Sequence, residues 1–320
     1  MKYTTLGNTD IKVSRICVGC MSFGDSDGRF HKWTLGYDPS KEMIKHALSL
    51  GITFFDTANV YSEGTSEEYL GRAIKELGVR REDVVFASKV FFNEGKLSKE
   101  AITREIDATL KRLGTDYLDL YQIHRFDYEH PMEETMEALD ELVKSGKVRA
   151  IGASAMYGYQ FHNLQVIAEQ NGWTKFSTMQ NHYNLLYRED ERELIPVCEQ
   201  YGVTRIPYSP LAGGHLSRAT WDSDSLRGQT DNVSRSKYDH AKENDMQIVS
   251  VVKAIADERG VSMSQIALAC LLAKGANPIV GSTKPHHYDD AVNALDIALT
   301  EEEISRLEDS YLPHQIVGAL

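Results

Sequence analysis

Four polar side chains stand where short apolar segments of the sequence end. Asp56, Lys89 and His124 each close such a segment, and Tyr61 follows Asp56 by five residues. A carboxylate, an ammonium, a phenol and an imidazole together suit reduction of a carbonyl group by hydride transfer, because the alkoxide that forms needs a proton. The tyrosine phenol has an ordinary pKa of about 10. A buried ammonium beside it favours the phenolate and lowers that pKa.

This chemistry assigns a role to each of the four residues. Tyr61 is the predicted general acid, and Lys89 is the ammonium that eases the release of its proton. Asp56 would keep Lys89 charged and in position, and His124 would hydrogen-bond the substrate oxygen or assist the proton transfer. Neither a covalent nucleophile nor a metal ion is needed if a nicotinamide supplies the hydride.

The elements that must position these residues alternate along the chain between two kinds. Continuous apolar and β-branched runs predict strands that are covered on both faces. Amphipathic stretches between them predict helices. The predicted strands are residues 16–21, 53–57, 84–89, 117–124, 148–154, 177–180, 205–209 and 278–281, and clear helices are residues 66–77, 99–113, 132–144 and 246–259.

Strict alternation of strands and helices fits either an open doubly wound sheet or a closed barrel. The near-even spacing of the strands favours the closed (β/α)8 TIM barrel. The 320 residues correspond to about two domains at roughly 150 residues each, but an α/β barrel of this length is one unit. Residues 1–320 are therefore predicted to form a single barrel domain, whose strand ends bring the four polar residues to one face.

Three segments fall outside the alternation. Residues 3–13 carry Gly-Asn-Thr-Asp between apolar residues and predict a β-hairpin that plugs the bottom of the barrel. The polar stretch 211–245 is predicted to be a loop insertion after the seventh strand, mobile and near the ligand. Residues 311–320 are apolar enough to fold over the barrel mouth.

The composition narrows the partners and the compartment. Lys and Arg number 35 against 47 Asp and Glu, so the net charge is −12. This balance argues against nucleic acid or an anionic membrane as the main partner, although a small anionic ligand needs only a local positive cluster. Four cysteines fit a reduced cytoplasm. No segment resembles a signal peptide or is apolar enough to cross a bilayer, so we expect a cytoplasmic protein, with its oligomeric state left open.

Four known motifs are considered and rejected. The first strand is followed neither by the glycine fingerprint of a Rossmann fold nor by the lysine of a P-loop. Tyr37 and Lys41 have the spacing of the short-chain dehydrogenase pair, but Pro39 lies between them. Cys17 and Cys20 have C-x-x-C spacing, but residues three apart on a strand point to opposite faces, which favours buried free thiols.

Three motifs make the sequence similar to the aldo-keto reductase superfamily over essentially the whole chain. Residues 54–71, Phe-Phe-Asp-Thr-Ala-Asn-Val-Tyr-Ser-Glu-Gly-Thr-Ser-Glu-Glu-Tyr-Leu-Gly, resemble that family's first signature. Asp-Leu-Tyr-Gln-Ile-His at 119–124 and the Ser-Lys strand end at 88–89 resemble two more. The resemblance implies a (β/α)8 barrel that binds NADPH in an extended form without a Rossmann fold. It also implies that the four residues above are the catalytic tetrad.

The resemblance further implies a cofactor site along the strand ends. One loop would lie beside the nicotinamide ribose, two polar residues would hold the carboxamide, and an aromatic ring would stack on the nicotinamide. At the far end, backbone N–H groups and a lysine favour the 2′-phosphate. These residues are Gly19, Cys20 and Met21 at the ribose, Ser154 and Gln180 at the carboxamide, Tyr208 at the ring, Ser209, Leu211, Gly213 and Arg218 at the pyrophosphate, and Gly281, Ser282 and Lys284 at the 2′-phosphate.

The sequence departs from the family pattern at three positions. Ala155 follows Ser154 where many members have Asn. His287 and Ala291 stand where many members have an Arg for the 2′-phosphate and an Asn for the adenine. Lys284 still favours NADPH, and NADH is the alternative cofactor. If His287 touches the phosphate, its hold would weaken as the pH rises.

Aromatic residues in the loops after the strands predict the substrate class. Arg125 directly follows the predicted catalytic histidine. We expect a small-molecule aldehyde or ketone of aromatic or medium size, with an anionic group near Arg125. The aromatic residues are Trp33, Phe91, Phe92, Phe126, Tyr157 and Tyr183.

Two other functions remain open on the sequence. Lys89 would form a Schiff base if the chain were a barrel aldolase, but this leaves the segment around Tyr61 and the turn at 281–284 without a role. The chain would otherwise be a cofactor-binding regulatory or redox-sensing subunit with little turnover, because its 211–245 segment resembles the potassium-channel β-subunit branch of the superfamily. The complete set of four catalytic-type residues weighs against pure binding.

Overall fold

A computed structural model describes residues 1–25 and 31–319, and its first element is the predicted hairpin. Leu6, Ile11 and Val13 of this hairpin are buried in one apolar cluster with residues of the barrel interior. The hairpin therefore closes one end of the barrel, which confirms the predicted plug. Its antiparallel strands are β1 (Tyr3–Thr5) and β2 (Lys12–Ser14).

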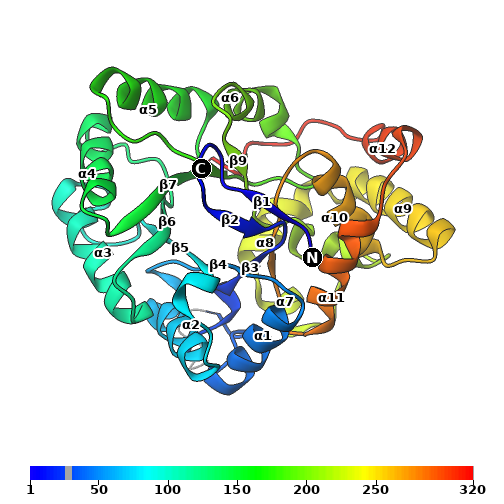
Figure 1. The fold of residues 1–320 in the computed structure, drawn as a ribbon. Coiled ribbons are helices and arrows are strands. Elements are labelled where there is room, and N and C mark those ends of the chain that lie inside the picture. The colour runs from blue at the N-terminus through cyan, green and yellow to red at the C-terminus, as the bar shows by residue number, and fades with distance from the viewer. Residues whose placement is uncertain (26–30, 320) are drawn as a thin grey trace.

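In the described part of the chain, eight parallel strands form one sheet with helices around it (Figure 1). Asn277 N donates to Arg205 O (2.9 Å) and Ile279 N donates to Pro207 O (3.0 Å). These bonds join the first and last strands of the sheet, so the (β/α)8 TIM barrel is confirmed. In spatial order the strands are β10 (Ile279–Gly281), β3 (Cys17–Gly19), β4 (Phe54–Asp56), β5 (Val85–Val90), β6 (Leu118–Ile123), β7 (Val148–Ser154), β8 (Thr178–Gln180) and β9 (Thr204–Arg205).

Several helices begin at a residue whose side chain accepts from a free backbone N–H group. Ser98 Oγ accepts from Ala101 N at the start of α3, and Thr300 and Glu303 form a capping box at α12. The helices are α1 (Tyr37–Ser49), α2 (Thr65–Glu76), α3 (Lys99–Leu113), α4 (Met132–Lys144), α5 (Gly158–Asn171), α6 (Leu194–Gln200), α7 (Leu226–Thr230), α8 (Asn232–Tyr238), α9 (Lys242–Arg259), α10 (Met263–Ala273), α11 (His286–Asn293) and α12 (Glu301–Glu308).

Strand β9 is shorter than the sequence predicts. The expected strand runs over residues 205–209, whereas the ladder ends at Arg205. Tyr208 pairs with His182 only through an isolated bridge, and Ser209 has a left-handed φ of 52°. Beyond Arg205 the chain keeps only single backbone bonds to the segment around β8, from Ile206 N and Tyr208 N, and it turns away at Ser209.

The predicted loop at 211–245 is largely helical. It contains a 3-10 segment (Ala212–Ser217), α7 and α8, and α9 begins at Lys242 instead of residue 246. Leu216, Trp221 and Tyr238 are buried in an apolar cluster with residues of α9 and α10. These apolar residues are spaced too widely along the chain to show a helical period. Their contact with α9 and α10 forms only when these segments pack together, so the local sequence pattern does not predict it.

The C-terminal segment returns to the barrel after α12. The N–H groups of Val317 and Gly318 each lie 3.2 Å from the Tyr187 hydroxyl, to which they donate. Arg125 Nη1 lies 3.4 Å from Gly318 O. The tail is therefore held beside the end of β6, and the last residue of the sequence lies outside the described residues.

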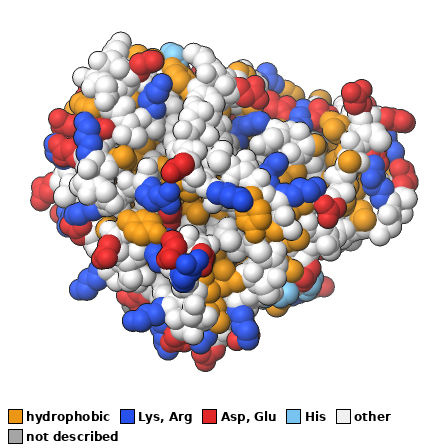
Figure 2. All heavy atoms as spheres, in the orientation of Figure 1, with side chains coloured by type: hydrophobic (Ala, Val, Ile, Leu, Met, Phe, Trp, Pro, Cys, Tyr) orange, Lys and Arg blue, Asp and Glu red, His pale blue; other side chains and the backbone are white. Residues whose placement is uncertain are grey.

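The surface carries charges of both signs. Figure 2, which views the hairpin end of the molecule, shows Lys and Arg side chains interspersed with Asp and Glu. Across residues 1–25 and 31–319, none of the helices has the length and apolarity that a bilayer crossing requires.

Candidate active site

Lys89, near the end of β5, is wholly buried at the centre of the strand ends. Its Nζ donates to Asp56 Oδ2 (2.6 Å), to the backbone oxygen of Thr57 (2.8 Å) and to the Tyr61 hydroxyl oxygen (3.2 Å). An ammonium has three N–H donors and no acceptor. These three contacts therefore satisfy the buried charge.

Asp56 is held by a layer of polar side chains inside the barrel. Its Oδ1 accepts from Gln122 Nε2 and from Gln180 Nε2, both at 2.9 Å. The three residues come from β4, β6 and β8, and side chains of alternate strands share a layer in this fold. Both carboxylate oxygens are thus occupied, one by the glutamines and one by Lys89.

Gln122 has no role in the sequence-based prediction. The sequence could have indicated a role for Gln122, because it stands two residues before His124 and therefore on the same side of the strand. Gly152 on β7 leaves room for it. A Cβ at Gly152 would lie 2.2 Å from Thr178 Oγ1 and 3.0 Å from Gln122 Cγ, distances that no ordinary packing tolerates.

Tyr61 is brought over Lys89 by a strained turn after β4. Ser62 and Glu63 have left-handed φ angles of 46° and 56°, a region that non-glycine residues seldom adopt. Lys89 Nζ lies 4.8 Å from the centroid of the Tyr61 ring. Such strain persists only where surrounding structure imposes it, and it is common at functional sites.

Burial and charge set the protonation states of this pair. Burial alone would lower the pKa of Lys89, but Asp56 and Tyr61 outweigh it and raise that pKa above its usual value. Burial raises the pKa of Tyr61 above 10, and Lys89 opposes only part of the rise. Lys89 acts on the Tyr61 pKa in the predicted direction, but the burial of the phenol, which the sequence alone does not show, outweighs it. At neutral pH the site holds an ammonium and a protonated phenol.

His124 lies immediately after β6 and faces Tyr61. The two rings meet edge to face with centroids 5.9 Å apart. Burial, Lys89 and Arg125 keep the pKa of His124 well below its usual value, so the imidazole is neutral. Its Nδ1 is buried and has no hydrogen-bond partner among the described residues.

The residues predicted at the ribose follow β3 and lie next to this centre. Gly19 pairs with Asp56 in the β3–β4 register. Cys20 and Met21 begin the 3-10 turn that follows, and Cys20 O accepts from Ser66 Oγ at 2.8 Å. The free thiols of all four cysteines are buried.

The residues predicted at the nicotinamide come from β7, β8 and the chain after β9. Ser154 and Gln180 pair in the β7–β8 register. One face of the Tyr208 ring is stacked on His182, with centroids 5.1 Å apart. Asn181 Oδ1 is a buried acceptor with no donor in the described part of the chain. An amide N–H of a carboxamide is the kind of group that such an acceptor requires.

The residues predicted at the pyrophosphate lie under α8. Ser209 and Gly213 have left-handed φ angles of 52° and 64°, and Leu211 packs beside the core. A Cβ at Gly213 would lie 2.1 Å from Ser234 Oγ of α8. The insertion therefore covers this stretch of chain directly.

Arg218 holds its own segment together. Its Nη1 donates to Gly214 O (2.7 Å), and its Nη2 donates to Trp221 O (2.9 Å) and lies 3.2 Å from His215 Nδ1. The structure thus uses the guanidinium within the insertion, whereas the sequence-based prediction directs it to the pyrophosphate.

The turn predicted at the 2′-phosphate joins β10 to α11. Gly281 ends β10, and Ser282 Oγ accepts from Lys284 N (2.9 Å) and lies 2.7 Å from His287 Nδ1. Burial and the neighbouring His286 and Lys284 lower the pKa of His287, so it is uncharged at neutral pH. The exposed Lys284 is the cation that this turn presents.

The aromatic residues predicted at the substrate lie in different places in the structure. Trp33 is 6% exposed and lies under the guanidinium of Arg227 from α7, 4.5 Å from its ring centroid. Phe91 packs at the edge of the core, whereas Phe92 meets the His124 ring at 5.0 Å. Phe92 is therefore the aromatic side chain beside the catalytic-type residues.

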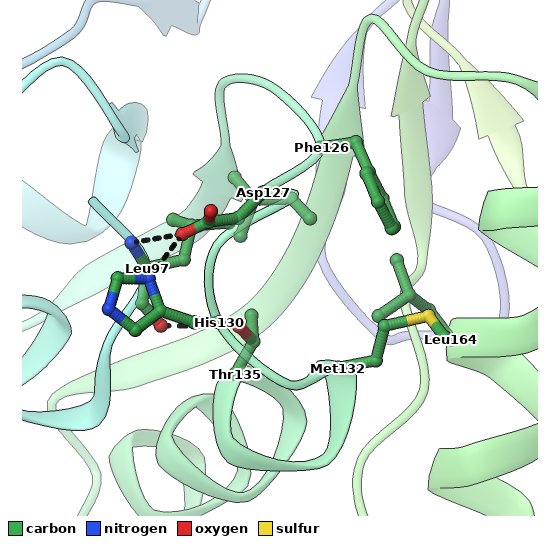
Figure 3. Close-up of a pocket in the computed structure, with 8 residues that line it drawn as sticks. Leu97, Phe126, Asp127, His130, Met132, Thr135 and Leu164 are labelled. Atoms are coloured by element: carbon green, nitrogen blue, oxygen red, sulfur yellow. Dashed lines mark hydrogen bonds and ion pairs between the residues drawn. The ribbon is translucent and has the colours of Figure 1, made fainter.

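Phe126 lines a small cavity beside the β6–α4 connection (Figure 3). In Figure 3 its ring points toward Met132 and Leu164. Asp127, which also lines the cavity, accepts from Leu97 N at 3.0 Å, and its Oδ2 lies 2.8 Å from His130 Nδ1. The structure places Phe126 against this cavity, while the sequence-based prediction places it at the substrate.

Comparisons with known proteins agree with this geometry. The family model described as the aldo/keto reductase family matches residues 15–311. The chain is 41% identical to versiconal hemiacetal acetate reductase of Aspergillus parasiticus and 41% identical to a putative aryl-alcohol dehydrogenase of Schizosaccharomyces pombe, over 99% of this chain and 98% of each relative. The crystal structure of the thermostable aldo-keto reductase Tm1743 with the inhibitor epalrestat matches with a TM-score of 0.76 and 30% identity, over 97% of this chain and 100% of that chain.

Proposed function

Because this chain belongs to the aldo/keto reductase family and is an oxidoreductase, we propose that it reduces aldehydes and ketones to alcohols with hydride from NADPH and a proton from Tyr61. The observation that carries the proposal is the buried ammonium of Lys89, 3.2 Å from the Tyr61 hydroxyl and 2.6 Å from Asp56. A protonated phenol beside a fixed cation is an acid whose conjugate base is stabilised as soon as it forms.

Each side chain has a distinct part in the proposed reaction. A bound nicotinamide supplies a hydride to the carbonyl carbon. Tyr61 donates its proton to the substrate oxygen, and Lys89 stabilises the phenolate that remains. The raised pKa of Tyr61 does not prevent this step, because an alkoxide is a stronger base than a phenolate. His124, neutral and beside Tyr61, hydrogen-bonds the same oxygen and orients it.

The layer of Asp56, Gln122 and Gln180 keeps Lys89 in one protonation state and one position. This feature also weighs against a Schiff-base aldolase, because imine formation needs a free amine. The contacts and charges around Lys89 hold it as an ammonium. The glutamines therefore act on the reaction through Asp56.

The cofactor would lie along the strand ends from the centre of the site to the turn after β10. The buried acceptor Asn181 Oδ1 suits the carboxamide, and the exposed Lys284 suits a 2′-phosphate. Since His287 is uncharged at neutral pH, Lys284 carries the preference for NADPH over NADH. The further residues that would hold the cofactor are Gly19, Cys20, Met21, Ser154, Gln180, Tyr208, Ser209, Leu211, Gly213, Gly281 and Ser282.

The proposed substrates are small aromatic carbonyl compounds. Phe92 beside His124 offers an aromatic wall next to the reacting oxygen, and it is half exposed. Two relatives are named as a hemiacetal acetate reductase and a putative aryl-alcohol dehydrogenase. Both names describe chemistry at an alcohol or a masked carbonyl group.

Substitution of Tyr61 tests the proposal. Tyr61→Phe removes the proton and keeps the ring, so kcat for aldehyde reduction should fall by roughly 10²–10⁴-fold. The affinity for NADPH, measured by fluorescence titration, should stay within about twofold of the wild type, because a general acid acts on the chemical step. Tyr159→Phe on α5, whose side chain is exposed, is the matched control.

Two results would contradict the proposal. Unchanged turnover of Tyr61→Phe would remove Tyr61 from the chemistry. Tight NADPH binding by the wild type, without oxidation of NADPH by any member of a panel of aromatic, aliphatic, sugar and dicarbonyl aldehydes, would instead indicate a regulatory subunit.

A further inference from the structure

Glu67 is a wholly buried acidic residue that the reaction described above does not use. It lies in the first turn of α2, the helix that begins directly after the turn carrying Tyr61. Its Oε1 accepts from Ser88 Oγ on β5, and its Oε2 accepts from Arg112 Nε on α3, both at 2.5 Å. A buried carboxylate is unfavourable unless it is paired and hydrogen-bonded, and these two partners from separate elements satisfy it.

The contact with Ser88 ties α2 to the strand that holds the buried ammonium. Ser88 directly precedes Lys89 on β5. Because successive side chains of a strand point to opposite faces, Ser88 faces the helices while Lys89 faces the barrel interior. Lys89 Nζ in turn donates to the Tyr61 hydroxyl oxygen at 3.2 Å. Glu67 therefore fixes the start of α2 against the residue next to Lys89.

The contact with Arg112 supports the strained turn itself. Gly64, the last residue of that turn, has a φ of 92°, and a Cβ there would lie 2.7 Å from Arg112 Cδ and 2.9 Å from Arg112 Nε. The Arg112 side chain therefore packs directly against the backbone of Gly64. Ser62 and Glu63, whose left-handed φ angles carry the strain, lie between Gly64 and Tyr61. Such strain persists only where the surroundings impose it, and Arg112 is one of the side chains that do so.

These contacts form a closed ring that begins and ends at the general acid. Successive members of the ring are linked by the chain itself or by a side-chain contact. Glu67 is the member that joins α3 to β5, so its removal opens the ring. In order, the members are Tyr61, Gly64, Arg112, Glu67, Ser88 and Lys89.

We propose that Glu67 is a positioning residue that fixes the distance between the Tyr61 hydroxyl and the Lys89 ammonium, and thereby the rate of proton transfer to the substrate. This inference rests on the proposed function, because it concerns the general acid of that reaction. Glu67 acts through the turn and through β5. A displacement of about 1 Å in a reacting group can lower a rate roughly 10²-fold, so this ring of contacts matters for the chemical step and not for the binding of the cofactor.

The test measures the chemical step directly. In stopped-flow experiments with enzyme in excess over NADPH and saturating benzaldehyde, the single-turnover rate of NADPH oxidation reports the transfer of hydride and proton without product release. Glu67→Met removes both acceptor oxygens at similar volume and should lower this rate roughly tenfold or more. The loss should stay below that of Tyr61→Phe, because Ser66 Oγ still holds the start of α2 by donating to Cys20 O at 2.8 Å. The affinity for NADPH, from fluorescence titration, should stay within about twofold of the wild type.

A double variant separates a positioning role from a merely structural one. If Glu67 acts through Tyr61, Glu67→Met should change the residual rate of Tyr61→Phe by no more than about twofold, because residues that act as a unit are not additive. A general loosening of the site would instead lower that residual rate by the same factor as in the wild type. Glu67→Gln keeps an acceptor for Arg112 and a donor for Ser88, so its rate should stay within about threefold of the wild type.

Glu76→Gln is the matched control on the same helix. Glu76 also contacts two basic side chains, Lys41 at 2.6 Å and Arg72 at 2.8 Å, but its side chain is 36% exposed. The substitution removes one acidic charge and should leave the single-turnover rate within about twofold of the wild type. Circular dichroism and the melting temperature reveal a misfolded Glu67→Met. In that case Ser88→Ala takes its place, because it removes one bond of Glu67 and keeps the ion pair, and it should lower the rate about threefold or more with the same dependence on the Tyr61 hydroxyl.

Three results would overturn the role of Glu67 alone. These are an unchanged single-turnover rate in the folded Glu67→Met variant, an equal loss in the Tyr61→Phe background, and a weakened fluorescence titration with NADPH, which would assign the effect to the cofactor site. A failure of the proposed function is distinguishable, because it shows in the parent proteins. A wild type without turnover, or Tyr61→Phe with full turnover, would refute that function and the role of Glu67 with it.

Discussion

Removing the charge of Asp56 should destabilise the protein in a strongly pH-dependent manner. Asp56→Asn keeps the shape of the side chain and one acceptor oxygen. In the wild type, Oδ2 accepts from Lys89 and Oδ1 accepts from Gln122 and Gln180. The single oxygen of the asparagine amide can accept from Lys89 only if the N–H₂ group faces Gln122 and Gln180, which are themselves donors. Lys89 then remains wholly buried with neutral acceptors alone.

The size of the effect follows from the burial of the pair. Breaking a buried ion pair by removal of one partner costs about 3–5 kcal/mol, because an uncompensated charge is left inside. Without Asp56, burial is the dominant influence on Lys89, and it lowers the pKa of the ammonium. A loss of about 3 kcal/mol corresponds to a change of roughly two units in that pKa.

The sign of the pH dependence follows from proton linkage. In the wild type the folded-state pKa of Lys89 is raised, so its stabilisation is fully present below the unfolded pKa of about 10.4 and is lost as the pH rises through the folded value. In Asp56→Asn the folded-state pKa is lowered, so the unfolded state binds more protons. Its stability therefore rises with pH up to about 10.4. The difference between the two proteins should shrink between pH 7 and pH 10.

Urea unfolding followed by circular dichroism at several pH values between 7 and 10 measures this difference. Asp10→Asn is the matched control, because its side chain is 92% exposed and the net charge changes equally. The double variant Asp56→Asn with Lys89→Met should recover part of the lost stability, since it removes both charges. A pH-independent loss, or a double variant less stable than Asp56→Asn, would refute the reasoning.

Two other predictions concern the tail and the cofactor. His314 Nε2 and Asp245 Oδ1 form a buried pair at 2.8 Å. Burial lowers the pKa of His314, but Asp245 outweighs burial and raises that pKa. In urea unfolding, His314→Gln should therefore destabilise the protein more at pH 6 than at pH 9, and an equal loss at both pH values would argue against a charged pair. In steady-state kinetics, Lys284→Ala should raise KM for NADPH about tenfold or more while KM for NADH changes little, because only NADPH carries the 2′-phosphate. An equal change in KM for both cofactors would place the 2′-phosphate elsewhere.

The barrel and its main residues were predictable because their signals are local. Continuous apolar strands and amphipathic helices alternate evenly, and Asp56, Lys89 and His124 stand at or near strand ends, where this fold collects its functional groups. The hairpin was predictable for a related reason. Its apolar residues flank a turn-forming segment, and a barrel bottom must be covered by apolar side chains.

Other features were hidden because they depend on contacts between distant segments. The helices within residues 211–245 are stabilised by a cluster that includes Trp221 and Tyr238 with α9 and α10. Arg218 was assigned by its charge to the pyrophosphate, but nearby carbonyl groups bind it. Phe126 was assigned by its place after β6, but its ring turns toward a cavity beside α4.

By itself, the sequence determined the alternation of strands and helices, favoured closure into a barrel and placed Asp56, Lys89 and His124 at or near strand ends with Tyr61 just beyond, because periodicity and motif spacing are written along the chain. Only the tertiary structure decided the balance of charge and burial at those residues. It joined Gln122 and Gln180 to Asp56, raised the pKa of Tyr61 and brought Glu67 to Ser88. Each of these outcomes depends on distances between segments and on the exclusion of water, neither of which a linear pattern contains.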